Sequence, residues 1–177
     1  AASDVYKRQA HSGLYKGLSL RKGYYINGGT MQAGGLSYDW DIKNLCCDNP
    51  SYAEMEKQIT SVSPGADGML YMPYILGERA PYFDTGAKGA FLGLKATHTR
   101  AHMSRSVMEG VALHLAIILN RMEKLDAVDS VRIVGGGAKS AAWRQIMADV
   151  FQKSIIKTNV DLNAGSLGTA VLAGVGA

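Results

Sequence analysis

The stretch Ser130-Val-Arg-Ile-Val-Gly-Gly-Gly-Ala-Lys-Ser140 decides the fold class of this chain. Residues 130–134 are rich in β-branched side chains, so they predict a short strand that runs directly into the three glycines. Ser140 is a favourable N-cap, and the apolar residues after it keep the 3.6-residue period of a helix: Trp143, Ile146, Met147 and Val150. A strand that turns through glycines into a helix predicts an α/β domain.

The glycine loop carries the strongest chemical signal in the sequence. Gly135, Gly136 and Gly137 have no side chains, so the backbone there can closely approach a flat or anionic ligand. The helix after the loop is expected to offer free N–H groups at its positive end. These properties suit a nucleotide, although three glycines after a strand are equally consistent with a tight structural turn.

Two familiar nucleotide-binding loops do not fit the spacing. A Walker loop requires Gly, four residues and then Gly-Lys-Ser/Thr, but Ala138 precedes Lys139 and Ile133 stands where the first glycine belongs. A Rossmann fingerprint requires a third glycine where this chain has Ser140. The second mismatch also argues against an independent dehydrogenase domain.

Helices and strands alternate along the rest of the chain. Thr30 is expected to cap the first helix, and Ser51 and Glu54 form a capping-box pattern at the second. Residues 76–88 carry few signals of regular structure and predict a long irregular connection. The predicted strands are residues 23–27, 69–74, 89–94 and 155–158, and the predicted helices begin at residues 31, 51, 99 and 166.

Composition excludes several classes of protein. The chain has 177 residues, 47% hydrophobic and 19% charged, which fits one domain with a real core. The net charge of +4 is spread without a basic run, so we expect no nucleic-acid partner. Apolar runs fall short of the roughly 18 residues of a membrane span, so we expect no membrane partner.

The two cysteines and the first residues add two expectations. Cys46 and Cys47 are adjacent and poorly placed to join distant segments, which favours a reduced, cytoplasmic setting. Residues 1–12 are interpreted as a leader, either non-native or disordered, because they lack a signal-peptide core and differ in character from the rest of the chain.

Three linked segments resemble the FGGY family of carbohydrate kinases. The most specific is Gly89-Ala-Phe-Leu-Gly-Leu94, then seven residues, His102-Met103, two residues, and Ser106-Val-Met-Glu109. Upstream, Met72-Pro-Tyr-Ile-Leu-Gly-Glu-Arg-Ala-Pro81 is similar to a family segment that ends in Gly-Glu-Arg-x-Pro. Downstream, the glycine loop and Leu167-Gly-Thr-Ala170 resemble the family's adenosine-binding loop and closing helix.

The resemblance implies an actin-like, ribonuclease-H-type ATPase fold. Residues 13–177 would be part of the carboxy-terminal, nucleotide-binding half of a two-domain sugar kinase, incomplete at both ends. The missing domain would supply the catalytic Asp and most sugar contacts, so no catalytic residue is expected in this chain. The implied cofactors are ATP and Mg²⁺, with Gly135, Gly136, Gly137 and Ala138 at the adenosine and Ser140 beside it.

The implied activity is ATP-dependent phosphorylation of a sugar, sugar acid or polyol by the full-length enzyme, with this chain inactive alone. Residues 77–81 and 95–103 are similar to gluconokinase-like and xylulokinase-like members. A non-catalytic, actin-like nucleotide-binding module is the alternative, and a homodimer is left open.

Several polar side chains keep more than one interpretation. Glu78 and Arg79 either line the substrate cleft or brace their loop. Arg105 and Glu109, four residues apart on one helix, favour a structural pair over catalysis.

The histidines favour structural roles. His98 and His102 have a spacing that can chelate a metal, but His98 should precede the helix and no third ligand is evident, so we expect no metal site. His114 is expected to be a core histidine with its hydrogen bonds satisfied.

Overall fold

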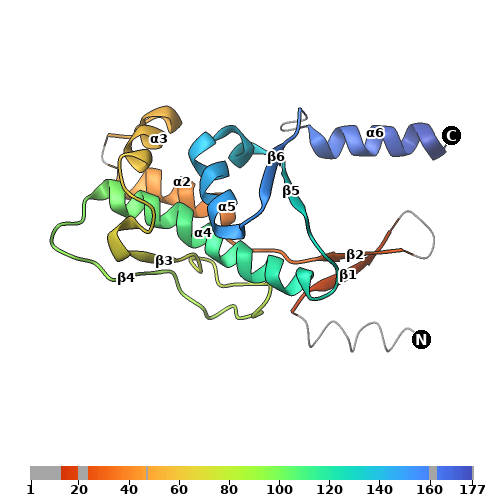
Figure 1. Cartoon of the computed structure of the whole chain (residues 1–177), viewed down its shortest axis with the longest axis horizontal. Coiled ribbons are helices and arrows are strands. Elements are labelled where there is room, and N and C mark those ends of the chain that lie inside the picture. Colours follow the sequence, from red (N-terminus) through yellow and green to blue (C-terminus); the bar gives the residue numbers. More distant parts are fainter. Residues whose placement is uncertain (1–12, 20–23, 47, 160–162, 177) are drawn as a thin grey trace.

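The computed structural model describes residues 13–19, 24–46, 48–159 and 163–176 (Figure 1). The expected leader at residues 1–12, Gly23 of the first predicted strand, and Cys47 lie outside these ranges. The elements, in chain order, are β1 (Tyr15–Leu18), β2 (Tyr25–Gly28), α2 (Gly34–Leu45), α3 (Tyr52–Thr60), the short turn η1 (Ala66–Gly68), β3 (Leu70–Met72), β4 (Ala90–Leu92), α4 (Arg100–Glu123), β5 (Ser130–Ile133), the short turn η2 (Gly136–Lys139), α5 (Ala141–Phe151), β6 (Ser154–Lys157) and α6 (Ala164–Gly176).

The strands pair in three places. β1 and β2 form an antiparallel hairpin, and β3 pairs antiparallel with β4. β5 and β6 are parallel, with Ser130 opposite Ser154, and α5 connects them. A parallel pair needs such a crossover, so this β–α–β unit confirms the α/β class predicted from the glycine stretch.

Helix α4 organises the core. It runs through the middle of the body, with α2, α3 and α5 on one side and β3 on the other (Figure 1). Gly110 permits the close approach to β3, because a Cβ at this position would lie 2.2 Å from the carbonyl oxygen of Tyr71. The four helices share one cluster of buried side chains: Tyr38, Ile42, Cys46, Met55, Ile59, Met108, Val111, Ala112, Trp143, Ile146 and Met147.

Local capping chemistry explains where most helices begin. Ser51 and Glu54 form the predicted capping box at α3, Thr99 caps α4, and the Ser140 hydroxyl accepts from Trp143 N at α5. These hydrogen bonds satisfy backbone donors that the first turn of a helix leaves unpaired. The three predicted helix starts are therefore confirmed.

The predicted first residue of the first helix was wrong. The helix begins at Gly34 with Ala33 as its N-cap, not after Thr30. Contacts with the loop at residues 78–80 hold the preceding backbone: the Thr30 carbonyl accepts from Ala80 N at 3.1 Å, and Gln32 N donates to Glu78 at 3.0 Å. These tertiary bonds take the place of a first helical turn.

Helix α6 projects away from the body at the end of β6 (Figure 1). It begins at Ala164, close to the position predicted from Ser166. None of the described helices, α6 included, is long and apolar enough to cross a membrane.

Candidate functional site

A cavity of about 640 Å³ lies between α2, α3 and the start of α5. Each of these three parts of the chain contributes a small group of residues to its wall. They are Gly35, Tyr38 and Asp39 from α2, Tyr52, Ala53 and Glu56 from α3, and Gly136, Gly137, Lys139, Ser140 and Trp143 from the glycine loop and α5. The volume falls within the range of about 300–1,000 Å³ that is typical of small-molecule sites.

The glycine loop forms one side of the cavity with open space above it. Gly135 has φ +87°, a conformation that favours glycine, and it turns the chain out of β5. Gly136 lines the cavity, and a Cβ there would meet no atom within 4 Å. Packing within the protein therefore does not require glycine at position 136, and a longer side chain there would extend into the cavity.

The predicted loop residues divide into two groups. Gly136, Gly137 and Ser140 line the cavity, but Gly135 and Ala138 do not. Ala138 is buried because the tight turn η2 directs it inward, and its carbonyl accepts a hydrogen bond from the Arg144 side chain. Ala138 thus anchors the glycine loop to the protein interior and does not line the cavity.

The start of α5 differs from the expectation of free N–H groups. Ser140 Oγ accepts from Trp143 N at 3.1 Å, which occupies one donor of the first turn. Ala142 N donates to Glu56 Oε1 at 2.7 Å, and the Ser140 hydroxyl donates to the same oxygen at 3.0 Å. The positive end of this helix is therefore already matched by a carboxylate from α3, which the sequence did not indicate.

Aromatic rings from α2, α3 and α5 form another part of the cavity wall. The rings of Tyr38 and Trp143 meet edge to face with centroids 5.6 Å apart, and Tyr52 lies 6.0 Å from Tyr38. Burial raises the pKa of Tyr38, and the nearby carboxylates of Asp41 and Glu56 raise it further, so Tyr38 is neutral over the physiological pH range. Such rings provide flat apolar surfaces for a flat ligand.

Two polar groups of this aromatic side limit what it can bind. Tyr52 donates its hydroxyl to Asp39 Oδ1 at 2.9 Å, and this bond raises the pKa of Tyr52. The indole Nε1 of Trp143 is buried and has no hydrogen-bond partner among the described residues. The wall thus offers flat apolar ring surfaces, whereas the buried Nε1 is not accessible to a ligand in the cavity.

Comparison with known proteins places this chain in a family. The model of the FGGY family of carbohydrate kinases, C-terminal domain, matches residues 5–177. The chain belongs to this family.

Individual relatives agree with the family assignment. The xylulose kinase of Bacillus subtilis is 37% identical over 155 residues, covering 86% of this chain and 30% of the relative. The gluconokinase of Bacillus licheniformis is 34% identical over 151 residues, covering 78% of this chain and 29% of the relative. The chain thus spans less than a third of the length of these kinases.

The structural comparison agrees with the sequence comparison. The crystal structure of ligand-bound xylulose kinase from Lactobacillus acidophilus superposes with a TM-score of 0.83 at 26% identity, covering 91% of this chain and 32% of that one. The actin-like ATPase fold expected for FGGY kinases is therefore confirmed.

Contacts of the buried Glu78 side chain hold the FGGY segment that contains Glu78 and Arg79. Glu78 is buried, and its Oε1 accepts from Gln32 N at 3.0 Å and Arg79 N at 2.6 Å. Its other oxygen lies 3.3 Å from His114 Nε2, which donates to the Ala80 carbonyl at 2.9 Å. Glu78 thus holds its loop through two backbone amides and lies beside a histidine, and it does not form the arginine–carboxylate brace with Arg79. A role in the substrate cleft stays a prediction.

Arg79 and His114 have opposite environments in this loop. The Arg79 side chain is exposed and forms no ion pair with any residue that the structure describes. His114 is buried, and its Nδ1 lies 3.3 Å from the Tyr74 hydroxyl, so the expected core histidine is confirmed. Neither Glu78 nor Arg79 lines the cavity at the glycine loop.

The signature pair Arg105 and Glu109 is structural, as predicted. Arg105 Nε lies 2.7 Å from Glu109 Oε1, and its NH1 donates to the carbonyls of Ile59 and Val62 at 3.1 and 2.8 Å. Glu109 also accepts from Gly65 N at 3.0 Å. The pair therefore ties the end of α3 and the following turn to α4.

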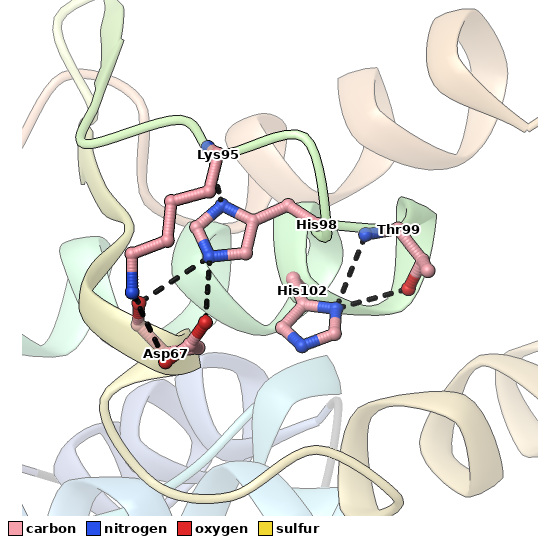
Figure 2. Close-up of polar contacts among 5 residues, drawn as sticks. All are labelled: Asp67, Lys95, His98, Thr99 and His102. Carbon is pink, nitrogen blue, oxygen red and sulfur yellow. Dashed lines mark hydrogen bonds and ion pairs between the residues drawn. The ribbon is translucent and has the colours of Figure 1, made fainter.

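The FGGY signature histidines take part in local packing (Figure 2). His98 Nε2 lies 3.3 Å from Asp67 Oδ2, and its Nδ1 accepts from Lys95 N at 3.1 Å. His102 stacks on His98 at 5.1 Å and accepts from Thr99 N at the start of α4. No group of three or more His, Cys, Asp or Glu side chains suited to a metal occurs in the part of the chain that the structure describes.

Proposed function

We propose that this chain supplies the nucleotide-binding domain of an ATP-dependent kinase that phosphorylates a hydroxyl of a sugar, sugar acid or polyol. The observation that carries the proposal is the cavity lined both by the glycine loop and by aromatic rings. Membership of the FGGY family agrees with it, and relatives named xylulose kinase and gluconokinase favour an acceptor of that chemical type.

The cavity residues fit the nucleoside part of ATP. The space over Gly136 would be filled by any side chain, and a flat base can lie between this loop and the rings of Tyr38 and Tyr52. The Trp143 ring lines the same cavity and adds apolar surface to it. Binding and orientation of the nucleoside are the roles that we assign to these residues.

The described residues offer no comparable site for Mg²⁺. Because they include no suitable cluster of three carboxylates or histidines, we assign no residue to the metal. Mg²⁺ would enter with the phosphates of ATP, whose oxygens are its usual ligands in kinases.

The sugar and the catalytic carboxylate would be supplied by the part of the kinase that this chain does not cover. The chain spans about 30% of its xylulose kinase relatives, so we expect it to bind nucleotide and to phosphorylate nothing alone. We also place the kinase in the reducing cytoplasm, in agreement with the adjacent Cys46 and Cys47.

The test is to titrate ADP into the chain and into a variant whose cavity is filled. Gly136→Leu should raise the Kd for ADP about tenfold or more, since a lost base contact exceeds about 1.4 kcal/mol. Gly168→Leu is the matched control, because Gly168 lies in α6 and is also free of neighbours within 4 Å. Equal ADP affinity of folded Gly136→Leu and wild-type chains would place the nucleotide elsewhere.

A further inference from the structure

The amino end of α5 borders the cavity and would ordinarily attract phosphate. A helix carries partial positive charge at its N-terminus, and its first N–H groups are natural donors to an anion. Ser140 is the N-cap of this helix, and both Ser140 and Trp143 line the cavity. On general grounds, a nucleotide could therefore bind here with its phosphates first.

Glu56 changes this expectation. Its Oε1 accepts from Ala142 N at 2.7 Å and from the Ser140 hydroxyl at 3.0 Å, so a full negative charge lies against the helix end. Two hydrogen bonds hold the carboxylate at this position, and the buried neighbours Met55 and Ile59 fix the place of α3 in the core.

The other charges of the cavity do not compensate for Glu56. The charged residues in its wall are two carboxylates, Asp39 and Glu56, and one ammonium group, Lys139. Like charges a few ångströms apart repel, and the repulsion is stronger where burial lowers the effective dielectric constant. A phosphate at the helix end would thus meet a carboxylate at the position where its own oxygens would bind.

We propose that Glu56 determines the direction in which a nucleotide occupies the cavity. Its negative charge repels phosphate from the N-terminus of α5. The uncharged nucleoside then occupies the space lined by the glycine loop and the aromatic rings. The phosphate chain then points out of the cavity. This inference rests on the proposed nucleotide-binding function and deepens it, because it assigns a specificity-determining role to a residue outside the glycine loop.

Glu56→Gln is the decisive variant. A glutamine keeps a carbonyl oxygen for Ala142 N and removes only the charge. Glu54→Gln is the matched control: it removes the same charge from the same helix, lies outside the cavity, and retains the capping box, which accepts Gln in place of Glu. Circular dichroism establishes that both variants are folded.

The measurement is calorimetric titration with pyrophosphate, without divalent metal. Glu56→Gln should bind pyrophosphate about threefold or more tightly than Glu54→Gln, as expected for a helix end freed of a compensating charge. Equal pyrophosphate affinity of the two folded variants would overturn the role of Glu56.

A second measurement needs only the wild-type chain. Pyrophosphate should fail to displace bound adenosine, because Glu56 keeps the anion away from the cavity. Competitive displacement of adenosine by pyrophosphate would overturn the inference even if Glu56→Gln did not fold. Failure of the wild-type chain to bind adenosine would instead overturn the proposed nucleotide-binding function, so the two failures are distinguishable.

Discussion

The buried carboxylate of Glu78 lies 3.3 Å from the ring nitrogen Nε2 of His114. This nitrogen donates to the carbonyl of Ala80, so one histidine on α4 holds both ends of the turn at residues 78–80. The same turn fixes the backbone before α2 through Gln32 N. His114 thus connects the FGGY loop to two helices.

His114→Ala should lower the free energy of unfolding by about 2 kcal/mol, because it leaves the Ala80 carbonyl without its buried donor and opens a cavity beside Glu78. Urea denaturation measures the change. His114→Gln should recover part of the loss, since its amide can donate to the same carbonyl. An unchanged midpoint for His114→Ala would contradict the bracing role, and exposed Arg79→Ala is the control.

Gly110→Ala tests the contact between α4 and β3. The added Cβ would lie 2.2 Å from the Tyr71 carbonyl oxygen, so the helix must shift, at a cost of about 2 kcal/mol. Gly174→Ala in α6 meets no atom within 4 Å and should instead stabilise its helix by about 0.5–1 kcal/mol. If Gly110→Ala proved as stable as Gly174→Ala in urea, the close packing of α4 on β3 would be incorrect.

Asp41 predicts an unusual pH dependence of stability. Burial raises its pKa, and this effect outweighs the neighbouring Ser104 hydroxyl and the charge of Arg100, which both lower it. Because the folded pKa lies above the unfolded one, the folded state favours the protonated form. At low pH the carboxyl is protonated and the cost of burying its charge is absent, and stability is lost as pH rises through the raised pKa.

Asp41→Asn should therefore stabilise the chain relative to wild type at pH 7, by about 1.4 kcal/mol for each unit by which the pKa is raised. The gain should shrink at pH 4, where Asp41 is closer to neutral. Urea denaturation at both pH values measures the difference, and exposed Asp129→Asn serves as the control. A gain that is the same at pH 4 and pH 7 would argue against a buried charge.

Ser140→Ala tests whether the N-cap of α5 contributes both to stability and to nucleotide binding. Loss of the hydroxyl removes the bond to Trp143 N and should cost about 1 kcal/mol in unfolding free energy. The loop should also become less fixed, so ADP affinity should fall. Thr99→Ala loses a comparable cap at α4, remote from the cavity, and should leave ADP affinity unchanged. Parallel losses of ADP affinity in both variants would indicate a general effect of stability.

Local chemistry made much of this fold predictable. The strand before Gly135, the cap at Ser140 and the Ser51–Glu54 box depend on neighbours in sequence, and the structure has each of them. Strand β1 was missed because its sequence, Tyr-Lys-Gly-Leu, has little β preference and becomes a strand by pairing with β2.

The far wall of the cavity could not be predicted in this way. Ser140 and Glu56 are separated by 84 residues, and only the packing of α3 against α5 brings them together. Tyr38 likewise reaches the cavity from the shared core, and the exposed Tyr52 reaches it from the start of α3. The motif identifies one side of the site, and tertiary packing supplies the other.

Nuclear magnetic resonance mapping of ADP binding tests the central claim most directly. Addition of ADP to the labelled chain should shift the amide signals of Gly136, Gly137, Ser140 and Tyr52 in a saturable manner. Signals from the Glu78 loop and from α6 should move little. Saturable shifts confined to those other regions, or no shifts at millimolar ADP, would contradict a nucleotide site between the glycine loop and the aromatic wall.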